Sequence, residues 1–117
     1  MAITTSYTVN LALSGDQVLN LPFTSAANAG SPFQEQVITT INGANTLTAP
    51  SGGSTPVGLI IIPPAANVIT MILKGVTGDT GVPLHLTNPH IVSLATTFVS
   101  CVITTNAIMT GLRLIWI

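Results

Sequence analysis

Apolar and polar residues alternate with a period of two along the first part of the chain. One face of an extended segment would carry Ile3, Thr5, Tyr7, Val9, Leu11 and Leu13, and the polar or small residues between them would lie on the other face. Because successive side chains of a strand point to opposite faces, this pattern predicts a half-buried β-strand. Ser14-Gly15-Asp16 then supplies a turn, and residues 17–23 predict a second strand.

Short apolar runs continue along the rest of the chain, separated by Gly, Pro, Asn and Ser. They predict strands at residues 36–41, 46–48, 57–62, 68–74, 82–86, 91–95, 98–103 and 108–117, with loops at 25–32, 49–56 and 75–81. Thr, Val and Ile dominate these runs, whereas the helix formers Glu, Lys and Arg are nearly missing. About eight to ten short strands in one domain, residues 1–117, favour an all-β, two-sheet β-sandwich of jelly-roll type.

Two turns in this pattern predict hairpins between neighbouring strands. Asn42-Gly43 lies between two strand segments, and both residue types tolerate a positive φ. Residues 104–107 separate the last two strand segments in the same way.

Two strand segments are apolar on both faces, which predicts central strands. Residues 57–62 form one of them, and residues 108–117 form the other. In the latter, one face would carry Ile108, Thr110, Leu112, Leu114 and Trp116. This last strand belongs either to the domain core or to an interface with a neighbouring subunit, with Trp116 as a core residue or an interface anchor.

Fixed charge is almost absent from the chain. Charged residues make up 4 % of it and apolar residues 47 %, and the charged residues are Asp16, Glu35, Lys74, Asp79 and Arg113. A typical soluble domain has about a quarter charged residues, and nearly neutral chains tend to associate. The composition therefore predicts a part of a larger assembly, covered by copies of itself or by other subunits. Two fixed cations cannot form the basic surface that binds nucleic acid directly.

Further features bear on where the chain is made. The apolar run 57–62 ends at Pro63-Pro64, too short for a membrane-spanning helix of about 20 residues, so we expect no membrane partner. The first residues show no basic segment followed by an apolar stretch, so we expect no secretory signal. Cys101 is the single cysteine and is expected to be buried. From the missing secretory signal and the single cysteine, we expect the chain to be made and folded in a reducing cytoplasm.

Catalytic and metal-binding signals are absent from the sequence. No nucleophile elbow, phosphate loop or metalloprotease motif occurs, and no spacing brings two carboxylates together. His85 and His90 are the only candidate metal ligands, and a zinc site usually adds Cys or carboxylate ligands. We interpret them as surface or hydrogen-bonded structural residues, and a metal shared around a symmetry axis stays an alternative. No cofactor and no catalytic residue are expected.

Isolated charges in so neutral a chain are expected to be paired. Arg113 lies on an otherwise apolar strand face, so its guanidinium should meet a carboxylate, Asp79 or Glu35, or else extend to the rim. Lys74 and Asp79 are expected to be paired as well, within the fold or across an interface. The candidate interface or ion-pair residues are therefore Lys74, Asp79, His85, His90, Arg113 and Trp116.

One segment resembles a family of known proteins. Residues 74–89, with the turn Gly78-Asp79-Thr80-Gly81 leading into Leu84-His85, resemble segments of small structural proteins of tailed bacteriophage virions. Ser93-Leu94 and Leu112-Arg113-Leu114-Ile115-Trp116 extend the likeness over the C-terminal part. The resemblance implies a non-enzymatic β-sandwich subunit of the particle, either a head decoration protein or a tail-associated component. The expected localisation is the virion, with synthesis in the host cytoplasm, and the absence of a secretory signal and of disulfides fits assembly inside an infected cell.

The leading hypothesis is therefore a capsid decoration (cement) protein. It would bind capsomers, with the major capsid protein as partner, as a symmetric homo-oligomer for which a trimer is favoured. One alternative is a tail or fibre module that binds a host glycan, which would need exposed aromatic residues. Another is a β-barrel enzyme or small-ligand binder that uses His85, His90 and Glu35.

Overall fold

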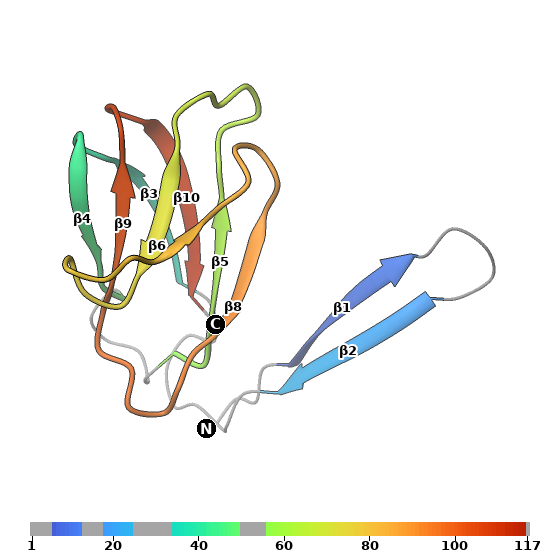
Figure 1. Ribbon diagram of the computed structural model, residues 1–117. Helices are drawn as coiled ribbons and strands as arrows, with labels where there is room; N and C mark the ends of the chain where they lie inside the picture. Colours follow the sequence, from blue (N-terminus) through green and yellow to red (C-terminus); the bar gives the residue numbers. More distant parts are fainter. Residues whose placement is uncertain (1–5, 13–17, 25–33, 50–55, 117) are drawn as a thin grey trace.

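The computed structural model describes residues 6–12, 18–24, 34–49 and 56–116, and these form ten β-strands without a helix (Figure 1). No helix in the described part of the chain could span a membrane. The strands are β1 (Ser6–Ala12), β2 (Val18–Thr24), β3 (Gln34–Thr39), β4 (Gly43–Leu47), β5 (Gly58–Ile62), β6 (Met71–Lys74), β7 (Val82–Pro83), β8 (His90–Ser93), β9 (Cys101–Thr105) and β10 (Thr110–Trp116).

Eight of these strands make two four-stranded antiparallel sheets, in the orders β3-β10-β5-β8 and β4-β9-β6-β7. The pairings are nested: β3 pairs with β10, β4 with β9, β5 with β8, and β6 with β7. This is the path of one long hairpin that is rolled up into two facing sheets, which is the jelly-roll topology. The predicted all-β, two-sheet β-sandwich is confirmed.

Alternate residues of the central strands fill the space between the sheets, as the period of two requires. β10 contributes Leu112, Leu114 and Trp116, and β5 contributes Leu59 and Ile61, all buried. The opposite sheet contributes Leu47, Met71, Cys101 and Ile103, and Met109 closes the core at one end. Residues 57–62 do form a central strand, but Ile60 and Ile62 on its outer face are only half-buried.

The two hairpins predicted around Asn42-Gly43 and residues 104–107 are wrong. Each of these turns leads from a strand of one sheet to a strand of the other. The local turn chemistry is present, since Gly43 has φ +117° and the Ile41 N–H donates to Asn45 Oδ1 at 2.8 Å. Pairing is decided instead by which long-range partners cover the apolar inner faces. Local turn signals therefore marked the corners correctly and the partners incorrectly.

The predicted faces of the last strand are correct only beyond Gly111. Gly111 has φ +85°, and the register between β10 and β3 shifts between Thr110 and Leu112. This bulge inserts one residue and reverses the alternation that precedes it. Met109 is consequently buried and Ile108 is 66 % exposed, so Ile108 does not share a face with Leu112, Leu114 and Trp116 as predicted.

Several strand boundaries are shorter than predicted. β6 begins at Met71 rather than at residue 68, because Asn67 holds a turn through its side-chain bonds to the backbone of Ile69. β7 ends at Pro83, and β9 begins only at Cys101.

β1 and β2 form a separate antiparallel hairpin, as the first two strand predictions imply. In Figure 1 this hairpin projects away from the sandwich. The predicted turn at residues 14–16 and the predicted loop at 25–32 lie outside the described residues, as does most of the loop at 49–56. The predicted half-burial of the first strand also falls on side chains that are not described.

Because Cys101 is buried, we expect the stability of the fold to depend on pH. Burial raises the pKa of the Cys101 thiol above its ordinary value, because the thiolate is poorly solvated there. Because the pKa of the thiol is higher in the folded protein, deprotonation of Cys101 favours the unfolded state. The contribution of the protonated thiol to folding stability is therefore complete below the ordinary thiol pKa and declines as the pH rises above it. Urea unfolding of wild type and Cys101→Val from pH 7 to 10 should show a steeper loss of stability in the wild type. Parallel pH profiles would contradict the account.

Candidate interaction surface

Four connections meet at one end of the sandwich, the upper end in Figure 1. They are residues 40–42, 63–70, 84–89 and 106–109, which we call the loop end. They lie together because the nested strand order places the corners of both sheets at the same edge.

Hydrogen bonds hold the β3–β4 corner against the β9–β10 corner. The Thr40 N–H donates to the Met109 carbonyl at 2.9 Å, and the Met109 N–H donates to the Thr40 hydroxyl at 3.0 Å. The Thr105 hydroxyl donates to the Ile41 carbonyl at 2.7 Å and lies 3.2 Å from the Thr40 hydroxyl. Thr40 and Thr105 are almost completely buried, so these bonds form in a dry environment where they are strong.

Two asparagines tie the other connections to this pair of corners. The Thr70 N–H donates to Asn106 Oδ1 at 3.0 Å. The buried Asn67 side chain donates to the Leu86 carbonyl at 2.7 Å and to the Ile69 carbonyl at 2.9 Å. Each connection of the loop end is thus bonded to another one, which gives this end a fixed shape.

The loop end combines exposed aliphatic side chains with exposed Asn, Thr and His, and it carries no fixed charge. Each connection exposes one large aliphatic side chain: Ile41 is 62 % exposed, Val68 81 %, Leu86 37 % and Ile108 66 %. All residues of the loop end are described, and none is Asp, Glu, Lys or Arg. Contact with a partner would therefore bury apolar surface without desolvating a charge. No local sequence pattern marks this surface, because the four side chains come from distant segments.

The described charged residues lie elsewhere on the domain. Arg113 Nε is 2.8 Å from Glu35 Oε1 on the outer face of the β3-β10-β5-β8 sheet, so Glu35 rather than Asp79 is its partner. The two side chains are 46 % and 49 % exposed, and such pairs contribute at most about 1 kcal/mol.

Lys74 and Asp79 bind their own turn and do not pair with each other in the described structure. The Val76 N–H donates to Asp79 Oδ2 at 3.0 Å, and Lys74 Nζ lies 3.5 Å from the Thr77 carbonyl oxygen. Of the two alternatives predicted for them, pairing with an opposite charge within the fold is not found among the described residues. Their exposed or half-buried positions leave pairing across an interface as a prediction.

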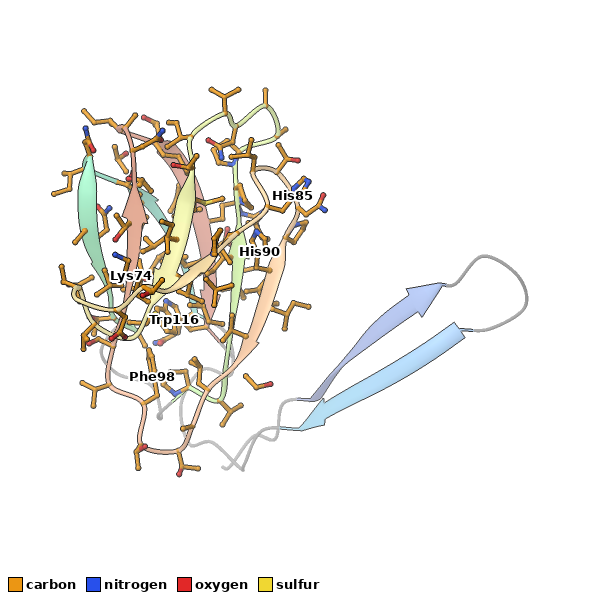
Figure 2. All side chains as sticks on the ribbon, in the orientation of Figure 1. Lys74, His85, His90, Phe98 and Trp116 are labelled. Carbon is orange, nitrogen blue, oxygen red and sulfur yellow. The ribbon has the colours of Figure 1, made fainter. Side chains whose placement is uncertain are left out.

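His85, within the loop end, and His90, the first residue of β8, lie close together (Figure 2). His85 Nδ1 accepts from the N–H groups of Thr87 and Asn88 at 3.2 and 3.0 Å. His90 Nε2 lies 3.0 Å from the His85 carbonyl oxygen. These bonds support the interpretation as structural histidines, and the described residues contain no group of three metal-ligating side chains.

Trp116 is a core residue and not an interface anchor. It is 2 % exposed, its Nε1 donates to Gln36 Oε1 at 2.8 Å, and its ring centroid lies 5.8 Å from that of Phe98 (Figure 2). Of the two predicted roles of Trp116, the structure supports the core residue and contradicts the interface anchor.

Comparison of the chain with models of protein families, with curated proteins and with solved structures finds no match. The resemblance to bacteriophage structural proteins and the virion role stay predictions.

Two adjacent threonines provide a matched test of the loop-end hydrogen bonds. Thr105→Val removes the donor to the Ile41 carbonyl and should lower the free energy of unfolding by about 1–3 kcal/mol. The neighbouring Thr104 hydroxyl is buried but has no hydrogen-bond partner among the described residues, so Thr104→Val should be neutral or stabilising. Chemical denaturation measures both, and equal effects would contradict the assigned bonds.

Proposed function

We propose that this chain is a non-enzymatic structural protein of a virion, a capsid decoration protein that binds capsomers as a symmetric homo-oligomer, with a trimer favoured. The observation that carries the proposal is the loop end, a rigid and uncharged surface with four exposed aliphatic side chains. In this proposal the loop end is the surface that contacts the major capsid protein.

The jelly-roll topology supports this role without establishing it. Viral capsid domains, lectin domains and cupins all use double-sheet jelly rolls. Since a fold hosts many functions, the surface must distinguish among them. A nearly charge-free surface suits permanent contact with other subunits better than independent life in solution.

The proposed mechanism is thermodynamic. Burial of apolar surface stabilises a contact by about 25 cal/mol per Å². A single loop end therefore makes a modest contribution, and many identical contacts across a particle add up to a clamp on neighbouring capsomers. Stiffness matters here, because a surface that is already ordered by the Thr40–Thr105 and Asn67 bonds loses little conformational entropy on binding.

The described side chains give less support to glycan binding. Carbohydrate recognition would need exposed aromatic rings, but Trp116 is buried and packs against the half-buried Phe98. Tyr7, Phe23 and Phe33 lie outside the residues whose side chains are described. We therefore favour the decoration role.

Variants of the loop end test the proposal in the particle. Ile41→Asp and Ile108→Asp each place a charge on an exposed site at this surface, so incorporation into virions should fall at least tenfold, which corresponds to about 1.4 kcal/mol. Quantitative mass spectrometry of purified particles measures the copy number relative to the major capsid protein.

Thr46→Asp serves as the control, because Thr46 is exposed on β4 away from the loop end. It should be incorporated like the wild type, and circular dichroism should show that all variants are folded. Normal incorporation of both loop-end variants would exclude this surface as the contact. Absence of the wild-type protein from particles would overturn the proposed function itself.

A further inference from the structure

The β1–β2 hairpin has one face that is apolar throughout. Its register pairs Tyr7 with Phe23, Val9 with Leu21, and Leu11 with Leu19. Directly paired residues share a face, and alternate residues along a strand share it too. These six positions therefore form one apolar face. The other face is mostly polar, with pairs such as Asn10 and Asn20.

No described strand of the sandwich pairs with this hairpin, and Figure 1 shows β1 and β2 directed away from the sandwich. An isolated two-stranded hairpin is marginally stable at best in water. Its apolar face needs another surface to pack against.

The sandwich offers an uncovered apolar face of its own. On the outer side of the β3-β10-β5-β8 sheet, one row of paired residues runs Val37, Arg113, Ile62, and the next runs Glu35, Ile115, Ile60, Ile91. Val37 is 64 % exposed and Ile91 43 %, and the other three isoleucines are half-buried. Outer faces of antiparallel sandwiches are usually polar. The two charges on this face form the Glu35–Arg113 pair, and burial of the five aliphatic side chains must offset the cost of desolvating it.

We propose that the β1–β2 hairpin of one copy packs its apolar face on the outer face of the β3-β10-β5-β8 sheet of a second copy. The two surfaces match in chemistry and length, since β1, β2 and β10 are each seven residues long, about 23 Å. The connection from Thr24 to Gln34 can span at most about 35 Å, enough to reach an adjacent sandwich.

The proposed contact is head-to-tail, because each copy donates a hairpin and accepts one on a different surface. Contacts of this type close into rings when the rotation allows it. The inference thus names the mechanism of self-association within the proposed function, on which it rests, and it does not involve the loop end.

Complementary variants test the proposed contact between the hairpin of one copy and the sheet of another. Val9→Asp with Leu21→Asp alters the donated face, and Val37→Asp with Ile91→Asp alters the accepting face. Light scattering after size exclusion should give an oligomer for the wild type and a monomer for each variant. An equimolar mixture of the two variants should give a heterodimer, because one intact hairpin then meets one intact sheet face.

The control variant Thr8→Asp with Asn20→Asp alters the opposite face of the hairpin and should leave the oligomer intact. Circular dichroism and thermal melting establish that each variant is folded. Deletion of residues 1–24 is a second hairpin variant, because β1 and β2 form a sheet separate from the two sheets of the sandwich. It should also be monomeric and should pair with the hairpin of the Val37→Asp, Ile91→Asp protein.

Other outcomes overturn the proposal. A monomeric wild type would mean that the hairpin packs on its own sandwich or on another protein. An oligomeric sheet variant beside a monomeric hairpin variant would mean that hairpins pair with each other. Failure of the mixture to associate would exclude the head-to-tail contact. These results are independent of the loop-end variants, which should keep the wild-type mass, so failure of capsid binding and failure of exchange are distinguishable.

Discussion

The packing of the two inner sheet faces against each other is the interaction on which the rest of this structure depends. Because fixed charges are so few, apolar burial must select both the strand partners and the register. β9 and β10 lie inside their sheets and carry much of the core, yet they pair with β3 and β4 from the other end of the sandwich sequence. Closing the core therefore forces the nested pairing, and the nested pairing gathers the corners at the loop end.

The same constraint explains why the surface is unusual. A core built from alternate residues leaves the intervening positions outside, and here many of those positions are aliphatic or Thr rather than charged. Three surfaces follow: the loop end, the outer face of the β3-β10-β5-β8 sheet, and the apolar face of the β1–β2 hairpin. In our account, a capsid partner covers the first, and the other two cover each other between copies. Exposed apolar surfaces of this kind are typical of proteins that bind partners, which is why we propose an assembly.

The fold class could be predicted from the sequence because alternation and turn residues are local signals. Partner choice could not, as Asn42-Gly43 shows: its geometry fits a hairpin, but β3 and β4 belong to different sheets. The pattern predicted that Leu112, Leu114 and Trp116 share a face, but it gave no sign of the bulge at Gly111, where φ is positive and before which Ile108 is exposed. An ion pair between Arg113 and a carboxylate could be predicted, but only the register between β10 and β3 identifies Glu35 as the partner. The loop end had no local signal at all.

Sedimentation equilibrium of the wild-type chain at micromolar concentration, from low to high salt, tests the central claim most directly. Apolar contacts are not screened by ions, so we expect an oligomeric mass that persists or increases as salt is raised. A monomeric mass over the whole range of salt would show that the exposed apolar surfaces need no neighbour, and would contradict the account.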